Sequence, residues 1–301
     1  MGINPDLEDE SMKRFILAWG SRRLILGPRT LVMGVLNVTP DSFSDGGRFD
    51  TVEKAVTQAE KLVTDGADII DIGGESTRPF SHPVSGDEEI RRVVPVIEKI
   101  VDRLRVPISI DTTKAEVVRQ ALNAGACMIN DISAMRMDPS IGSLAARAGV
   151  PLILMHMQGT PKTMQKTPHY DDLMGEIIGF LKDAMDRALA AGVNRERIII
   201  DPGIGFGKTY GHNLALINRL SALKALDAPI LVGPSRKAFI RHVLKKPGQD
   251  DLTPSHPDVA VGTQAVVAGA ILNGAHLVRV HDVAQTRMTV KMIDAIRREA
   301  P

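Results

Sequence analysis

The chain has 301 residues, of which 44% are hydrophobic and 24% are charged, and its formal net charge is +1. One parallel α/β barrel takes about 250 residues, so this length fits a single such domain with extensions. A nearly neutral charge argues against a general nucleic-acid or membrane binder but is compatible with a local anion site. The single cysteine, Cys127, excludes an internal disulfide and is typical of a protein in the reducing cytoplasm.

The N-terminal region has two predicted parts. Residues 1–12 are acidic and polar and are predicted to form a mobile tail, whereas residues 13–301 are predicted to form one domain. No long apolar segment follows a basic one, so no secretory signal is expected, and no run is long enough to span a membrane. Residues 14–30 hold two apolar stretches around Gly20 and Ser21, and this pattern predicts a β-hairpin suited to plug the bottom of a barrel.

From Leu31 onward, short apolar runs alternate with helical patterns. Each run is rich in Val, Ile and Leu, as in a parallel sheet that is covered on both faces. In chain order, the runs end at or next to Asn37, Gly73, Asp111, Asp131, His156, Asp201, Gly233 and His281. Eight such units predict an α/β fold of the (β/α)8 TIM-barrel type, in which the carboxyl ends of the strands carry the chemistry.

Helical periodicity follows most of the runs, and glycines mark several of the expected helix ends. The expected helices cover residues 51–65, 88–104, 114–124, 139–148, 172–191, 212–226, 235–245, 259–273 and 283–299. Two long loops, 38–50 and 74–87, are rich in Gly, Ser, Pro and Asp and are suited to move over a site. A polar segment at 245–258 is expected to be a surface excursion between two helices.

The glycine-rich segment DPGIGFGKT at 201–209 matches neither common phosphate-binding motif. A P-loop requires glycine at position 202, which is Pro202, and the glycine spacing does not fit the dinucleotide fingerprint. Two interpretations stay open: a turn that needs positive φ, or a turn that brings the backbone close to a flat ligand.

Arg279 and His281 are two residues apart in a predicted strand, so their side chains leave the same face. A buried guanidinium at a barrel mouth needs a negative partner, and with a nearby imidazole it suits phosphate or pyrophosphate oxygens. The alternative is a structural pair between Arg279 and a carboxylate.

Polar side chains at three other strand ends suit a heterocycle with N–H, NH2 and C=O groups on its edge. Asp111 and Asp201 can accept hydrogen bonds, and Asn130 can donate or accept them. Lys237 follows the seventh strand at an expected helix start and would lie near Asp201. Asn37 ends the first strand and is positioned to bind a Mg2+ ion that is carried in on substrate phosphates.

Seven separated motifs then identify a resemblance. NVTPDSFSDGG, IDIGGESTRP, IDTTK, INDIS, DPGIGFGK, GPSRK and VRVHDV occur in this order at the predicted strand ends. They resemble the dihydropteroate synthase family of the folate pathway over about residues 31–298. The resemblance implies a TIM barrel that condenses p-aminobenzoate with 6-hydroxymethyl-7,8-dihydropterin diphosphate and releases pyrophosphate by dissociative substitution. The family is the target of sulfonamides, and the resemblance also implies a homodimer formed through helices late in the barrel.

The resemblance also assigns roles to individual residues. The pterin is expected at Asp111, Asn130, Asp201, Phe206 and Lys237, and the diphosphate at Asn37, Arg279 and His281, with Mg2+ bound by Asn37 and Asp45. The p-aminobenzoate is expected at Phe43, Thr77, Arg78 and Pro79. The residues expected to act in catalysis are Asp111, Lys237, Arg279 and His281. Phe80 and Ala238 depart from the family pattern, where Gly and Ser are usual.

Two alternative functions stay open. A pterin-binding methyltransferase domain would share the barrel and the Asp/Asn pocket but would not need the Arg279–His281 pair. A catalytically silent homologue would keep the fold and act as a binding subunit. Product formation from the two substrates with Mg2+ distinguishes these alternatives.

Overall fold

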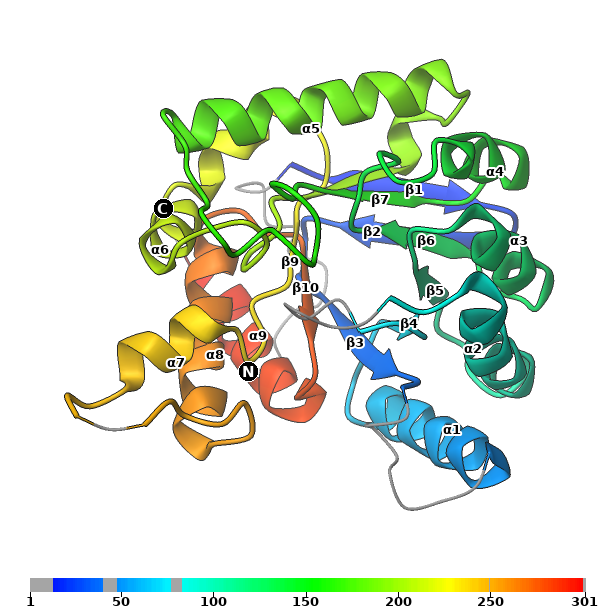
Figure 1. Ribbon diagram of the computed structural model, residues 1–301, viewed down its shortest axis with the longest axis horizontal. Coiled ribbons are helices and arrows are strands. Elements are labelled where there is room, and N and C mark those ends of the chain that lie inside the picture. The colour runs from blue at the N-terminus through cyan, green and yellow to red at the C-terminus, as the bar shows by residue number, and fades with distance from the viewer. Residues whose placement is uncertain (1–12, 40–47, 77–82, 249, 300–301) are drawn as a thin grey trace.

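The computed structural model describes residues 13–39, 48–76, 83–248 and 250–299. In this part of the chain, eight parallel strands form one sheet in the order β8-β7-β6-β5-β4-β3-β10-β9, and an isolated bridge between Ile200 and Ile230 closes it. Figure 1 shows helices around the outside of this barrel. The strands are β3 Leu31–Asn37, β4 Ile69–Gly73, β5 Ile108–Asp111, β6 Met128–Asp131, β7 Leu152–Met155, β8 Ile198–Asp201, β9 Leu231–Val232 and β10 Leu277–Val280. The predicted TIM barrel is confirmed.

The helices follow the strands as the periodicity predicts, with differences at their ends. They are α1 Arg48–Thr64, α2 Gly86–Ile100, α3 Ala115–Asn123, α4 Ser140–Ala148, α5 Leu173–Ala190, α6 Tyr210–Asn218, α7 Ala238–Leu244, α8 Pro257–Leu272 and α9 Val283–Arg298. The helix expected at 212–226 is α6 followed by the 3-10 helix η3, Leu220–Leu226. The helix expected from residue 235 begins at Ala238, because Arg236 has a φ of 59° and Lys237 is extended. None of the described helices combines the length and apolar character needed to cross a lipid bilayer.

The predicted N-terminal hairpin is present as β1 Phe15–Trp19 and β2 Arg22–Leu26, which pair antiparallel. Leu17 and Leu26 are completely buried and belong to the main core. The backbone of the hairpin accepts a hydrogen bond from Arg197, just before β8, and the Arg22 side chain reaches the carbonyl of Arg105, before β5. These contacts lie at the amino ends of the barrel strands, so the hairpin covers the end opposite the strand termini that carry polar residues.

The excursion after α7 is mostly exposed but is attached to the barrel at two described points. Leu252 is buried, and Arg241 forms an ion pair with Asp251 at 3.3 Å. The predicted tail, residues 1–12, lies outside the described residues.

Candidate active site

The strand register places three of the predicted site residues in one row. Asn37 is paired with Gly73, Gly73 with Asp111, and Asp111 with Asn130, so these residues lie side by side across β3, β4, β5 and β6. Because neighbouring residues in a parallel sheet share a face, their side chains point to the same side. Gly73 contributes no side chain, which leaves a gap in the row on β4.

An open pocket lies at this end of the barrel, with a volume of about 350 Å³ including the solvent at its mouth. Six predicted site residues line it together with four apolar or glycine positions. The lining residues are Asp111, Asn130, Ile132, Met155, Asp201, Ile204, Phe206, Gly233, Lys237 and Arg279. These residues come from six strand ends, so distant segments of the chain form one polar recess. Asn37 and His281 do not line it.

Arg279 already has carboxylate partners within the protein. Its Nε donates to Asp71 Oδ2 at 2.6 Å, and its Nη2 donates to Asp111 Oδ2 at 2.6 Å. The alternative that the sequence left open, a structural pair between Arg279 and a carboxylate, is therefore present, with Asp71 on β4 and Asp111 on β5 as the partners. Burial opposes the charge, but the two carboxylates outweigh it and raise the pKa of Arg279. The side chain is 22% exposed, and a guanidinium has five N–H donors, so a ligand anion can still bind it.

Asp111 shares this arginine, and the pKa of its carboxyl group is raised. Burial raises the pKa of its carboxyl group to about 7, Arg279 opposes the shift, and the negative charge of Asp71 adds to it. Its Oδ1 is buried and has no hydrogen-bond partner among the described residues. An N–H or NH2 group of a ligand would satisfy that atom, because a buried acceptor without a donor is costly.

Asp201 and the turn that follows β8 form the opposite wall of the pocket. Burial raises the pKa of Asp201 to about 6, and the backbone N–H of Gly203, which donates to Oδ1 at 2.7 Å, opposes this shift. Gly203 has a φ of 69°, and a Cβ atom built there would lie 1.9 Å from the carbonyl oxygen of His156. The interpretation as a turn that needs positive φ is therefore confirmed. Ile204 and Phe206 of the turn also line the pocket, and its close approach to a flat ligand stays a prediction.

Lys237 packs against this turn. Its Nζ is 4.1 Å from the centre of the Phe206 ring, a distance at which a cation interacts with the ring face. The φ of Arg236 and the extended backbone of Lys237 direct the lysine toward the barrel mouth before α7 begins. A flat ligand between Phe206 and the carboxylates would thus meet an ammonium group at one edge.

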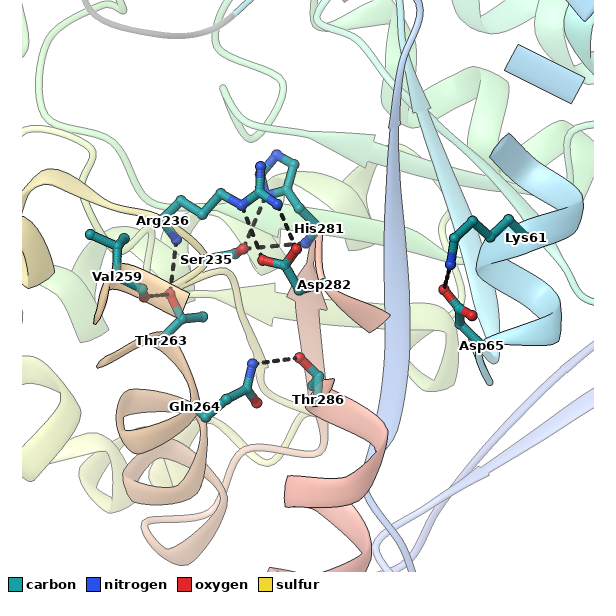
Figure 2. A network of polar contacts seen from close by, with 10 residues as sticks. All are labelled: Lys61, Asp65, Ser235, Arg236, Val259, Thr263, Gln264, His281, Asp282 and Thr286. Carbon is teal, nitrogen blue, oxygen red and sulfur yellow. Dashed lines mark hydrogen bonds and ion pairs between the residues drawn. The ribbon is translucent and has the colours of Figure 1, made fainter. Parts of the chain in front are cut away.

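His281 follows β10 and is held by Ser235, as Figure 2 shows. The backbone N–H of His281 donates to Ser235 Oγ at 3.2 Å, and its Nδ1 lies 3.0 Å from the same oxygen. Burial and the nearby Arg279 and Arg236 lower the pKa of His281 to about 3, so the ring is neutral at pH 7. Arg236, which was not predicted as a site residue, donates from Nε to Asp282 at 3.0 Å and fixes the chain beside His281.

Two further polar residues near the pocket were not predicted. Asp71 lies within β4 rather than at its end, so the rule that strand ends carry the site did not select it. Lys208 is 2% exposed, and its Nζ contacts His156 Nδ1 at 2.8 Å and the carbonyl of Phe206 at 3.0 Å. Its position directly after the GIGFG turn was the available signal. Burial lowers the pKa of Lys208 to about 7.

Several predicted residues lie outside the described part of the chain. They are Phe43, Asp45, Thr77, Arg78, Pro79 and Phe80. Ala238 is exposed at the start of α7. Among the described residues, no group of three or more His, Cys, Asp or Glu side chains is arranged to hold a metal ion.

The barrel and its polar pocket define a ligand-binding enzyme of the TIM-barrel class, and comparison with known proteins shows the family to which it belongs. The model of the family "Pterin binding enzyme" matches residues 33–281. The dihydropteroate synthase of Synechocystis sp. is 49% identical over 272 residues, which cover 90% of this chain and 92% of that protein.

Solved structures agree with this result. The Yersinia pestis dihydropteroate synthase, solved with a sulfonamide drug complex, is 42% identical with a TM-score of 0.86 and covers 95% of this chain and 100% of its own. The Xanthomonas albilineans dihydropteroate synthase in complex with 7,8-dihydropteroate is 42% identical with a TM-score of 0.81 and covers 93% and 98%. The chain belongs to the dihydropteroate synthase family.

Proposed function

We propose that the chain is a transferase that condenses 6-hydroxymethyl-7,8-dihydropterin diphosphate with p-aminobenzoate to give 7,8-dihydropteroate and pyrophosphate. The bond between the exocyclic carbon and the bridging oxygen breaks, and its electron pair leaves with pyrophosphate. A C–N bond forms to the aniline nitrogen, which loses a proton. The observation that carries this proposal is one pocket in which Asp111, Asn130, Asp201, Lys237 and Arg279 converge, in a chain of this family.

The pterin ring fits the chemistry of the pocket wall. Asp201 and Asp111 accept hydrogen bonds from the N–H and NH2 groups of the ring, and Lys237 donates to its C=O group. Phe206 and Ile204 offer apolar surface to the ring face. Each hydrogen bond to a charged group contributes about 1.5–3 kcal/mol, so the loss of one of them weakens binding measurably.

The diphosphate is bound where the guanidinium and imidazole meet. Arg279 keeps N–H donors that its two carboxylates do not use, and it stabilises the charge that builds on the departing oxygens. His281 is neutral, so it contributes a hydrogen bond rather than a charge. With Nδ1 accepting from the Ser235 hydroxyl, Nε2–H is the donor that faces the leaving group.

A Mg2+ ion fits this part of the site when it arrives with the diphosphate. Mg2+ prefers oxygen ligands and keeps most of its own waters, so one or two protein ligands suffice. The amide oxygen of Asn37, half-buried at the end of β3, is such a ligand, and Asp45 is proposed as the second. The ion would neutralise part of the negative charge of the diphosphate.

Substitution is dissociative in this proposal because the electron-rich pterin can support a cation at its exocyclic carbon. Cleavage of the C–O bond leaves positive charge on the pterin, and the Asp111 carboxylate beside the ring favours that charge. The p-aminobenzoate is then held for attack by Phe43, Thr77, Arg78 and Pro79, and Asp111, Lys237, Arg279 and His281 carry the chemical step.

The test is an assay of the purified full-length chain with both substrates and Mg2+, in which dihydropteroate and pyrophosphate are measured. We expect equimolar products. Binding of pterin without pyrophosphate release would indicate a methyltransferase-type pterin domain or a silent homologue. Loss of the methyl group from a bound methylated pterin would then separate these two.

We also propose that the enzyme is a homodimer through α8 and α9 and that it acts in the cytoplasm. Met288, Met292 and Ile296 are spaced four residues apart on α9 and are 63%, 62% and 54% exposed. Val261 and Leu272 on the neighbouring α8 are also more than half exposed. Contiguous apolar side chains of this kind typically mark a protein–protein interface.

A further inference from the structure

Asp71 is a buried carboxylate that lies one layer below the rim of the pocket. It is completely buried on β4, where the register pairs it with Val35 and Ser109. Gly73, two residues later on the same strand, occupies the rim row and has no side chain. Because inward-facing positions alternate along a strand, Asp71 is the first side chain of β4 beneath the pocket.

The polar partners of Asp71 are both pocket residues. Its Oδ2 accepts from Arg279 Nε at 2.6 Å and from Asn130 Nδ2 at 2.9 Å. Its Oδ1 is buried and has no hydrogen-bond partner among the described residues. Burying a carboxylate is costly, and here the compensating contacts come from groups that a ligand would use.

Asp294, another buried carboxylate, has partners of a different kind. Asp294 on α9 is 3% exposed, and it accepts from the backbone and hydroxyl of Thr30 and pairs with Arg297 at 3.4 Å. These contacts tie α9 to the bottom of the barrel, far from the pocket, so they are structural. Asp294 is therefore a matched control for Asp71: buried, paired with an arginine, and outside the site.

We infer that Asp71 is a positioning residue that orients Arg279 and Asn130 together and thereby sets the hydrogen-bonding polarity of the pocket. The carboxylate of Asp71, paired with Arg279, has no hydrogen to donate. Its Oδ2 can therefore only accept from Asn130, so the amide NH2 of Asn130 must point at Asp71. The Oδ1 of Asn130 is then turned away from Asp71, as an acceptor. The ring edge that meets Asn130 must present an N–H or NH2 donor. This inference rests on the proposed function for the identity of the ligand.

Asp71 also acts on the charge of the site. It shares Arg279 with Asp111, and its own charge adds to the effect of burial in raising the pKa of Asp111. Without the Asp71 charge, Arg279 would interact with Asp111 alone and would stabilise its ionised form. The pKa of Asp111 should then fall, and a merely structural role for Asp71 would not produce that change.

The experiment compares the Asp71→Asn variant of the full chain with the wild type and with Asp294→Asn. We expect the Kd of Asp71→Asn for the pterin diphosphate, measured by calorimetry, to rise by about tenfold or more, as is usual when the partner of a ligand-binding group is removed. The pH midpoint of single-turnover pyrophosphate release should move to lower pH by about half a unit or more. Asp294→Asn should lower thermal stability and leave both values unchanged. An unchanged Kd and midpoint in Asp71→Asn would overturn the inference.

If Asp71→Asn does not fold, exchanging the side chains of Asp71 and Asn130 provides a second test. Asn130→Asp alone places two carboxylates face to face and should weaken pterin binding strongly. The double variant Asp71→Asn/Asn130→Asp restores a donor opposite an acceptor, and we expect it to recover at least part of the affinity. Absence of any recovery would also overturn the inference. A wild type that binds no pterin would instead refute the proposed function.

Discussion

At the scale of single residues, Asp201 links ligand binding to pH. Burial raises the pKa of its carboxyl group to about 6, and the ionised form accepts the N–H donors of a pterin. Protonation of Asp201 below pH 6 competes with the ligand, so this group alone should lower the affinity by about tenfold between pH 7 and pH 5. Calorimetry with 6-hydroxymethylpterin at the two pH values measures this. The Asp201→Asn variant should bind about 1–3 kcal/mol more weakly at pH 7 and show a shallower pH dependence.

His276 links protein stability to pH in the opposite part of the barrel. It is 3% exposed, and burial together with Arg297 lowers its pKa to about 4 from 6.5. A histidine that is protonated only in the unfolded chain destabilises the fold as pH falls below 6.5. At pH 5 this effect amounts to about 2 kcal/mol, from 1.36 kcal/mol per pH unit.

The variant His276→Asn tests this effect. The amide oxygen of Asn can accept the hydrogen bond that Nδ1 of His276 now accepts from the N–H of Ile230. Between pH 7 and pH 5 the variant should lose about 2 kcal/mol less unfolding free energy than the wild type in urea titrations. Equal losses in the two proteins would contradict the assignment of a neutral His276.

The site residues were predictable from the sequence wherever the side chain lies at the end of a strand. Asp111, Asn130 and Asp201 could be selected because parallel strands bring their carboxyl ends together. Asp71 could not, because its role depends on how far the Arg279 side chain extends across the barrel. Which residues lie side by side, and how far a side chain extends to another strand, depend on the closed sheet. Neither can be read from the sequence of a single strand.

At the scale of elements, α6 begins with a capping box. The Thr209 hydroxyl accepts from the N–H of His212 at 3.1 Å, and the His212 ring accepts from the N–H of Thr209 at 3.3 Å. Thr209→Ala removes the first bond and should lower the unfolding free energy by about 1 kcal/mol, whereas Thr209→Ser should keep most of it. Chemical denaturation of the three proteins measures the difference, and equal stability of all three would show that the cap contributes nothing.

The order of strands and helices was predictable because continuous apolar runs and helical periodicity have different lengths and spacings. The end of α6 was not. Leu220, Leu223 and Leu226 are buried at a spacing of three, which matches the 3.0 residues per turn of the 3-10 helix that the structure shows. An apolar spacing of three or four also fits an α-helix, so the sequence pattern alone did not separate the two.

At the scale of the whole molecule, the exposed face of α9 should determine the oligomeric state. Met292 lies at the centre of the Met288–Ile296 row and is 62% exposed. A buried charge in a symmetric interface is opposed by its own copy, so Met292→Glu should shift the protein from dimer to monomer. Sedimentation equilibrium measures the change, and Lys291→Glu, an exposed neighbour outside the row, is the control. A monomeric wild type would contradict the proposal.

The junction between β8 and β9 has a consequence for how substrate affects the protein. β9 has two residues, and the isolated bridge Ile200–Ile230 joins the two strands. Asp201 directly follows this bridge on one side, and Lys237 follows β9 on the other. A pterin held by both residues would link β8 to β9, where one isolated bridge and a two-residue strand close the barrel. Amide hydrogen exchange at Ile200 and Leu231 should therefore slow when substrate is added, well beyond the residues it touches.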